Sequence, residues 1–554
     1  MACLLFLALT GCSETRRAGD DDESVSAAAA RIDPPQTSGQ QAADQTPAVI
    51  TNEPAREIVQ SQTITNSPLI VDDKADSPAT NATPDSATES KSASPNAGSI
   101  DKAETSSTAP AVSPSPDAPP QPSKNDLPPD RSRDWPQFRG ADGQGHGSAS
   151  GLPLRWNEKK NIAWKVPIRG NGWSSPVIVD NKIWLTTAIV PEKSLRVLCL
   201  DATTGATLHD VEVFHKDSLG GIHPKNSHAS PTPVLVDDRC YVHFGSHGTA
   251  ALNLNAEIVW KTEIKYYHHH GPGGSPVIVG GAAIIACDGF TSSFYDEQKI
   301  AGVTDPQFVV ALDTATGDVR WRRKRDGAHS YASPLVIDVE GQTQVISPGG
   351  NRVVAYDPST GEELWSCRYQ GYSLVPRPVS GHGLVFICTG YDVPTLLAIR
   401  TNGRGDVTDT HVAWKTNQAV PLNPSPILVG DELYTVSDQG VASCLDAKTG
   451  KLHWRKRLGG NHSTSPLFAD GRLYILDEVG TTHILSPGTK CKILAKNLLR
   501  GKTLASLAAS GRALYLRSDN HLYRIEATDA KPADEGDVKP GADEDPTPAE
   551  SEPQ

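Results

Sequence analysis

The sequence predicts an all-β protein, an eight-bladed propeller whose ring is closed by an N-terminal strand. Three observations lead to this fold class: a proline-led segment recurs along the chain, each recurrence contains four short strand patterns, and one strand is left over before the first recurrence. Four antiparallel strands in a unit of about 40–50 residues are typical of a propeller blade. We expect the folded body to extend over residues 134–527 of the 554-residue chain.

Seven segments begin with a proline followed by a short apolar run, as in SSPVIV, PTPVLV and PSPILV. The prolines are Pro176, Pro233, Pro276, Pro334, Pro378, Pro426 and Pro466. They follow one another at intervals of 40 to 58 residues, so the shortest interval gives the unit and the longer ones carry insertions. A repeat of this length overrules the three or four separate domains that the chain length would otherwise suggest.

A second frame lies inside the repeats, in VVALDTATGDVRW (309–321), VVAYDPSTGEELW (353–365) and ASCLDAKTGKLHW (442–454). VLCLDATTGATLH (197–209) keeps all of this frame except the tryptophan. The Asp and the Thr-Gly pair suit a tight turn between two strands, because Asp accepts backbone N–H bonds and Gly supplies positive φ. The tryptophan ends the last strand, where we expect its ring to pack between neighbouring blades.

The eighth unit, residues 503–527, contains only three strand patterns. The segment NIAWKV, residues 161–166, is a last strand without its own first three, since Trp164 lies 12 residues before Pro176 just as Trp414 lies 12 residues before Pro426. Pairing this strand with the eighth unit would close the ring and hide the strand edges that an open sheet exposes.

The repeated frame resembles the tryptophan-docking repeat of the PQQ-like eight-bladed propellers over residues 160–527. In one blade its residues are Asp313, Thr316, Gly317 and Trp321. The segment DWPQFRGADGQGHG (134–147) is similar to the N-terminal segment of a secreted, propeller-only group of that superfamily. The superfamily includes quinoprotein dehydrogenases and non-catalytic relatives such as the outer-membrane assembly lipoprotein BamB, so the resemblance specifies the fold more narrowly than the function.

The flanks of the body indicate an anchored envelope protein. Residues 1–12, MACLLFLALTGC, form an apolar run that is too short to span a bilayer and has the character of a secretion signal. Its ending resembles the lipobox of bacterial lipoproteins, which implies a lipid anchor on Cys12 and a place on the outer membrane facing the periplasm. Residues 13–133 are rich in Ser, Pro, Ala and Thr, and residues 528–554 are acidic and Pro-rich. Both compositions predict disorder, the first as a tether.

Charge and cysteine content exclude several classes of function. The formal net charge of −13 argues against nucleic acid as a partner. Beyond Cys3 and Cys12 the cysteines are Cys199, Cys240, Cys287, Cys367, Cys388, Cys444 and Cys491. Most of them lie in apolar runs and none is spaced CxxC, which favours buried free thiols over disulfides or a zinc site. We expect a monomeric body.

Two functions follow from the resemblance. The first, which we favour, is a non-catalytic, membrane-anchored scaffold that binds an envelope protein or a small ligand at the propeller face, with a BamB-like role in outer-membrane protein assembly and no cofactor. The alternative is a quinoprotein dehydrogenase that oxidises an alcohol or sugar with PQQ and calcium. A resemblance to the methanol-oxidising enzymes would imply a vicinal Cys-Cys pair. A dehydrogenase fused to a cytochrome would carry a CxxCH motif for haem attachment. The sequence has neither. No catalytic residue is predicted.

The crossing loops before the prolines should reach the mouth of the central channel, where polar and aromatic residues recur. The predicted ligand-binding residues are Asn171, Trp173, His228, His270, His329, Tyr331, Arg377, Asn461 and His462. Successive side chains of an extended loop point to opposite sides, so His268, His269 and His270 cannot all reach one ion. We therefore predict that His228, His270 and His329 are hydrogen-bonding groups of this mouth and predict no metal; a transition-metal site shared between blades is the second interpretation.

Overall fold

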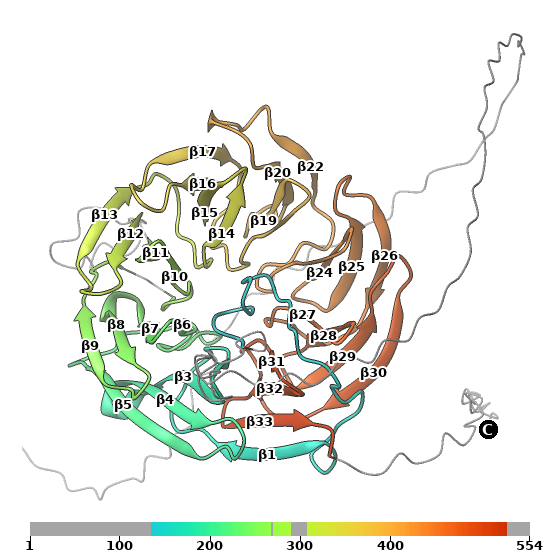
Figure 1. The fold of residues 1–554 in the computed structure, drawn as a ribbon. Coiled ribbons are helices and arrows are strands. Elements are labelled where there is room, and N and C mark those ends of the chain that lie inside the picture. The colour runs from blue at the N-terminus through green and yellow to red at the C-terminus, as the bar shows by residue number, and fades with distance from the viewer. Residues whose placement is uncertain (1–133, 268–269, 290–306, 529–554) are drawn as a thin grey trace, which may run out of the picture. The chain divides into compact units, whose positions relative to one another are not determined.

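The computed structural model describes residues 134–267, 270–289 and 307–528. Strands in these residues form eight antiparallel sheets that follow one another around a ring (Figure 1), which confirms the predicted all-β, eight-bladed propeller. The predicted signal peptide, the tether and nearly all of the acidic tail lie outside the described residues. No helix within the described ranges is long and apolar enough to cross a membrane.

Each blade runs from an inner strand at the axis to an outer strand at the rim. Blade 1 consists of β2 Val177–Val179, β3 Lys182–Ile189, β4 Ser194–Asp201 and β5 Thr207–His215, and blade 2 of β6 Val234–Val236, β7 Arg239–His243, β8 Thr249–Asn253 and β9 Ile258–Thr262. Blade 3 consists of β10 Val277–Val279, β11 Ala282–Asp288, β12 Gln307–Asp313 and β13 Val319–Lys324, and blade 4 of β14 Leu335–Val339, β15 Gln342–Gly349, β16 Arg352–Tyr356 and β17 Glu363–Arg368.

The second half of the ring repeats this plan. Blade 5 consists of β18 Val379–Gly381, β19 Leu384–Cys388, β20 Leu396–Arg400 and β22 Val412–Thr416, and blade 6 of β23 Ile427–Val429, β24 Glu432–Val436, β25 Val441–Asp446 and β26 Leu452–Arg457. Blade 7 consists of β27 Leu467–Ala469, β28 Arg472–Leu476, β29 Thr481–Ser486 and β30 Lys492–Leu498, and blade 8 of β31 Ala508–Ser510, β32 Ala513–Arg517, β33 His521–Glu526 and β1 Ile162–Pro167. Two short 3-10 helices, Val190–Glu192 and Gly245–His247, lie in connections.

The ring closes as predicted, because β1 pairs antiparallel with β33 as the outer strand of blade 8. The register places Trp164 opposite Arg524 and Pro167 opposite His521. One addition was not predicted: the insertion between β20 and β22 contains a two-residue strand, β21 Gly405–Asp406, which pairs parallel with β17 and covers the outer edge of blade 4.

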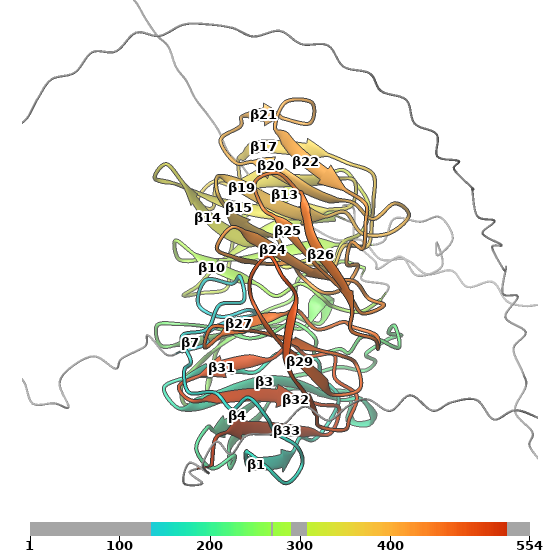
Figure 2. The ribbon, with the colours of Figure 1, turned by 90° about the vertical axis from the view of Figure 1, so that its right-hand side faces the viewer.

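The hydrophobic core is divided among the interfaces between adjacent blades. One cluster joins Val309 of blade 3 to Val354 of blade 4, and another joins Trp184 of blade 1 to Val242 of blade 2. The side view shows these sheets stacked against one another (Figure 2). All seven cysteines of the body are free; six are buried and Cys491 is half-buried, which confirms the prediction of unpaired thiols.

The outer-strand tryptophans dock on the next blade, which explains the repeated Thr-Gly turn. The Trp260 indole N–H donates to the Thr314 carbonyl (2.9 Å), and Gly317 lies against its ring with φ +80°. Trp164, Trp321 and Trp414 make the same contact with Gly205, Gly361 and Gly450. The aspartate of the turn behaves as predicted: the Asp313 carboxylate accepts the N–H groups of Ala315 and Thr316.

We predict that Gly317→Ala destabilises the body by about 2–4 kcal/mol. A Cβ there would lie 2.6 Å from the Trp260 ring, and the residue has positive φ. Gly341 is the matched control, since its φ is +82° and no atom lies within 4 Å of the added Cβ. Gly341→Ala should cost only the backbone component, about 1 kcal/mol. Urea unfolding measures both values, and equal losses would contradict the docking role of Gly317.

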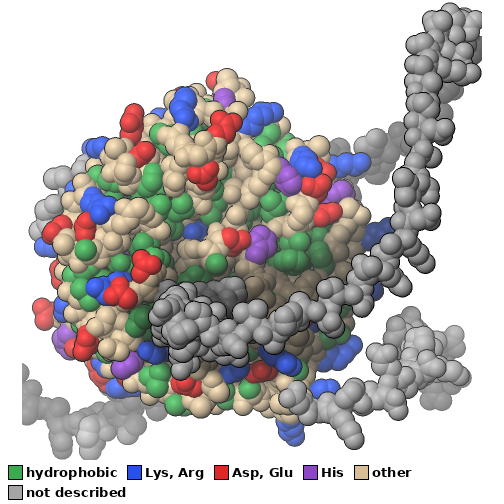
Figure 3. All heavy atoms as spheres, in the orientation of Figure 1, with side chains coloured by type: hydrophobic (Ala, Val, Ile, Leu, Met, Phe, Trp, Pro, Cys, Tyr) green, Lys and Arg blue, Asp and Glu red, His purple; other side chains and the backbone are tan. Residues whose placement is uncertain are grey.

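The N-terminal segment 135–147, here called the plug, crosses the axis and covers the free edges of the inner strands (Figure 1). It bonds to the residue two positions after the proline in five blades. These residues are Ile178, Leu235, Ser380, Leu428 and Phe468. Since unpaired strand edges are costly when buried, the plug completes the channel wall as well as blocking it. Around it, basic and acidic side chains are interspersed on this face (Figure 3).

Candidate functional site: a cavity at the mouth of the channel

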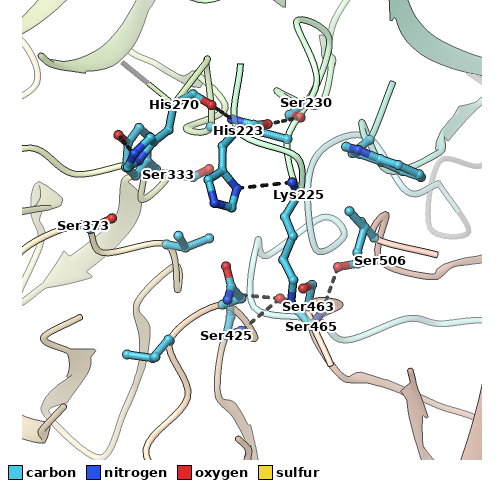
Figure 4. Close-up of a pocket in the computed structure, with 18 of the residues that line it drawn as sticks. His223, Lys225, Ser230, His270, Ser333, Ser373, Ser425, Ser463, Ser465 and Ser506 are labelled. Carbon is cyan, nitrogen blue, oxygen red and sulfur yellow. Dashed lines mark hydrogen bonds between the residues drawn. The ribbon is translucent and has the colours of Figure 1, made fainter. Parts of the chain in front are cut away.

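A cavity of about 700 Å³ occupies the axis where the crossing loops arrive (Figure 4). All eight blades line it. Most of them contribute the residues one and three positions before the inner-strand proline; blade 5 contributes Val375 but not Arg377, and blade 8, which has no such proline, contributes Leu504 and Ser506. Phe138 of the plug also lines the cavity and closes it on the side of the inner strands. A volume in the range of about 300–1,000 Å³ is typical of sites for small molecules.

A ring of hydroxyl groups surrounds the axis at the position directly before the proline and at the equivalent position of blade 8, where Leu507 replaces the proline. Its members are Ser175, Thr232, Ser275, Ser333, Ser425, Ser465 and Ser506, all buried. The hydroxyl oxygen of each accepts the backbone N–H of the equivalent residue in the preceding blade, at 2.8–3.1 Å. Blade 5 has Arg377 at this position, so the ring of hydroxyls is interrupted there.

Aromatic and imidazole rings form a wall over blades 3 to 5. His270 and Tyr331 are joined by a hydrogen bond between the imidazole Nδ1 and the phenol oxygen (3.1 Å). His329 lies beside both, with ring centroids 6.1 and 5.8 Å away, and contacts Tyr372 at 5.4 Å. Burial raises the pKa of Tyr331, so its hydroxyl stays protonated and can donate. Trp173 faces the cavity from blade 1.

The segment 219–226, here called the strap, crosses the mouth. The backbone N–H of His223 donates to the His270 carbonyl on blade 3, at 3.4 Å. On the other side the Lys225 ammonium forms an ion pair with Glu478 of blade 7 (2.8 Å; Figure 4 shows the lysine crossing the cavity). The strap is thus bonded to blades 3 and 7, on two sides of the cavity.

Four of the nine predicted residues line the cavity: Trp173, His270, His329 and Tyr331. The other five lie elsewhere, and two of them, Asn171 and Asn461, are exposed. Asn171 pairs with Ala188 of its own blade and does not reach the axis, whereas His329, which also lies five positions before its proline, lines the cavity. The position five residues before the proline therefore faces the cavity in some blades only, while the positions one and three residues before it line the cavity in most blades.

His228 and His462 turn into the protein, which corrects their predicted place in the mouth. His462 is fully buried, and both ring nitrogens lie 3.0–3.1 Å from carbonyl oxygens, those of Leu476 and Gly459. His228 is buried beside His247, with ring centroids 5.6 Å apart. Both side chains are therefore enclosed by protein, and neither lines the cavity.

Arg377 also points away from the cavity, toward the plug. Its guanidinium donates to the Phe138 carbonyl (2.7 Å) and packs against Gly143, where a Cβ would lie 2.7 Å away. Burial lowers the pKa of Arg377 to about 10. Burial, followed by repulsion from Arg377, lowers the pKa of Arg139 to about 9. These two arginines hold the plug in place by binding its own carbonyl groups and that of Pro426.

Of the histidine triplet, only His270 belongs to the part of the chain that the structure describes. His268 and His269 lie outside the described residues, and His270 belongs to the aromatic wall. Within the described ranges no group of three or more His, Cys, Asp or Glu side chains could hold a metal ion.

Calcium-bound PQQ does not fit the residues of this cavity. Calcium takes six to eight oxygen ligands. Among the described lining residues Asp438 supplies the one carboxylate, and its oxygens already accept the backbone N–H of Leu422 (2.6 Å) and the side-chain amide of Asn423. No cysteine lines the described cavity wall.

Buried histidines of blade 2 predict a loss of stability in acid. Burial, and secondarily His247, lowers the pKa of His243 to about 3; burial, and secondarily His228, lowers that of His247 to about 4. Their pKa values in the unfolded chain are about 6.5, so unfolding takes up protons below that pH. We expect each histidine to remove up to about 1.4 kcal/mol of stability per pH unit between pH 6 and 4.

Urea unfolding at several pH values tests this expectation. The free energy of unfolding of His243→Gln should depend less steeply on pH than that of the wild type, while the control variant His215→Gln, at an exposed site, should keep the wild-type dependence. The same dependence in both variants would contradict the role of His243 in acid sensitivity.

The sequence contained a signal for the missed hydroxyl ring. A Ser or Thr precedes six of the seven prolines, in SSP, PTP, GSP, ASP, PSP and TSP. The repeated residue type at a fixed distance from the inner strand marks a position that faces the axis in every blade. The exception is Arg377, whose longer side chain reaches the plug.

Comparison with known proteins agrees with this fold. A family model described as outer membrane protein assembly factor BamB matches residues 286–405 and 404–533. BamB of Legionella pneumophila is 24% identical over 200 residues, which covers 34% of this chain and 48% of that protein. BamB of Burkholderia pseudomallei is 24% identical over 295 residues, covering 51% and 69%. The chain thus spans about half the length of the first curated relatives it matches.

Solved structures add support for the architecture alone. The quinohemoprotein alcohol dehydrogenase of Comamonas testosteroni aligns with a TM-score of 0.53 at 12% identity, over 74% of this chain and 83% of that one. Together, the matched residues and the eight-bladed ring show a chain whose repeats are similar to those of the BamB assembly factors and whose architecture is that of an eight-bladed propeller.

Proposed function

We propose that this protein is a non-catalytic propeller scaffold of the bacterial envelope that holds a protein partner during outer-membrane protein assembly. The observation that carries the proposal is the similarity of its repeats to proteins named outer membrane protein assembly factor BamB. A propeller presents its loops on a rigid ring, which suits partner binding. The closure of the ring by β1 and the bonds of the plug to five inner strands support this role.

Lipidation of Cys12 would place the protein on the outer membrane, facing the periplasm. The lipobox-like ending LTGC supports this anchor, and the polar composition of residues 13–133 supports a long tether between the anchor and the body. We propose that the body is monomeric and reaches its partner through this tether.

Deletion of the gene tests the assembly role. We expect lower amounts of folded β-barrel proteins in the outer membrane, measured by their heat-modifiable migration on gels. The full-length gene should restore them, whereas Cys12→Ala should restore them poorly and appear in the soluble fraction. Unchanged amounts of folded barrels in the deletion strain would contradict the assembly role.

The dehydrogenase alternative is tested separately on purified protein. Incubation with PQQ and calcium, followed by alcohols or sugars and an artificial electron acceptor, should give no turnover. Turnover that depends on added PQQ would contradict the non-catalytic proposal.

A further inference from the structure

The charged groups around the mouth cavity already bond to other groups of the protein, and their charges balance, which bears on the ligand that the cavity can take. Lys225 is neutralised by Glu478, and the Ser463 hydroxyl donates to the same carboxylate (2.6 Å). The Asp438 oxygens accept bonds from Leu422 and Asn423. The Lys502 ammonium lies 5.6 Å from the centroid of the Trp173 ring and donates to the Pro224 carbonyl of the strap (3.2 Å). With Lys502 included, these residues supply two positive and two negative charges, so the cavity offers no excess of positive charge to an anion.

The hydroxyl ring leaves donors directed at the cavity. Each ring oxygen accepts a backbone N–H, so its own proton remains available. Among the described residues, Ser465 alone donates that proton within the ring, to Ser425 (3.0 Å). The other six hydroxyls bond to no protein acceptor in the described residues and need one from whatever fills the cavity. A ligand with several oxygen acceptors at different angles would satisfy them.

The aromatic wall requires a second property of the ligand, a flat face without charge. Tyr331 and Tyr372 on blades 4 and 5 present ring surface on one side, and Trp173 on blade 1 presents its indole on another. Rings of this size favour packing against C–H groups. Pyranose rings combine a face of C–H groups with hydroxyl and ring oxygens at the perimeter, which matches the aromatic wall and the hydroxyl ring together.

We propose that the mouth cavity binds an uncharged saccharide, stacked on Tyr331 and Trp173 and hydrogen-bonded to the hydroxyl ring. The cavity of about 700 Å³ lies in the size range of small-molecule sites, and the strap lies across its opening. This inference goes beyond the proposed function and does not depend on it, because it concerns ligand binding by the purified protein without its partner.

Calorimetry on the full chain tests the proposal with matched neutral and anionic probes. The neutral probes are N,N′-diacetylchitobiose, N-acetylglucosamine and glucose; the anionic partners of the last two are N-acetylmuramic acid and glucuronate. We expect saturable binding of the neutral sugars and at least tenfold weaker binding of their carboxylate counterparts. Tighter binding of the anionic sugars would overturn the proposal. So would the absence of binding by either set at concentrations up to 20 mM, since a Kd of 20 mM corresponds to a standard binding free energy of only about 2.3 kcal/mol in magnitude.

Two variants locate the site. Tyr331→Leu should weaken N,N′-diacetylchitobiose binding at least tenfold, whereas Tyr331→Phe, which keeps the ring and loses the hydroxyl, should stay within about threefold of wild type. Trp173→Leu provides a second test if Tyr331→Leu melts at a lower temperature. Wild-type affinity in both leucine variants would contradict the assigned site. Displacement of the sugar by N-acetyl-Gly-Tyr-Gly amide, an uncharged peptide, at equal concentration would contradict the preference for a saccharide.

Discussion

Removal of residues 134–166 is expected to leave a body that no longer melts cooperatively and that aggregates. The deletion takes away β1, and with it the outer strand of blade 8, so β33 becomes an exposed edge. It also removes the plug and exposes the backbone edges of five inner strands. Trp135 and Trp156, 2% and 3% exposed, leave the cluster between blades 7, 8 and 1.

A shorter deletion is the control for this experiment. Removing residues 1–133 alone leaves every described contact intact and should give the melting temperature of the full chain. Circular dichroism and sedimentation measure both proteins. If the 134–166 deletion melted cooperatively near the full-length temperature, the closure of the ring by β1 would be wrong.

The second large effect is expected at the buried ion pair between Asp288 and Arg325. Their side chains are 1% and 3% exposed. The Arg325 Nε donates to the carboxylate (2.7 Å), and its Nη1 donates to the carbonyl and hydroxyl of Ser347 in blade 4 (3.1 and 3.0 Å). Arg325→Met leaves a buried carboxylate without its partner, so we expect a loss of about 3–5 kcal/mol in urea unfolding.

The double variant separates this effect from simple loss of packing. Asp288→Leu/Arg325→Met removes both charges and should recover at least half of the loss, because the desolvation cost disappears with the pair. A double variant as unstable as Arg325→Met, or a single variant within 1 kcal/mol of wild type, would contradict the role of the pair.

The fold could be predicted almost completely from the sequence because its signals are local and repeated. The Asp-Thr-Gly turn and the outer-strand tryptophan act between adjacent blades, as the Trp260 contact with Gly317 shows. The lone strand with Trp164 could be assigned because its distance to Pro176 matches that in other repeats. The plug could not be assigned, because its bonds to Ile178 and Phe468 join residues far apart in sequence and follow no period.

The candidate site was predicted less well because polarity in a loop does not specify direction. His270 and His462 stand at similar distances from their prolines, yet one faces the cavity and the other bonds to carbonyls inside the protein. Conversely, the serines before the prolines are small and common, and only the ring geometry shows that Ser175 and Ser506 face a shared axis. The residue that broke the pattern, Arg377, turned out to bind the plug.

Disulfide trapping of β1 against β33 measures the central structural claim most directly, the closure of the ring by its N-terminal strand. Pro167 faces His521, and the neighbouring bond from the Ile168 N–H to the Asn520 carbonyl (2.9 Å) makes 167/521 a non-hydrogen-bonded pair, in which side chains lie closest. Under mild oxidation Pro167→Cys/His521→Cys should cross-link nearly completely and shift on a non-reducing gel, while Pro167→Cys/Glu526→Cys should not. No cross-link in the first pair, or equal cross-linking in both, would contradict the closed eight-bladed ring.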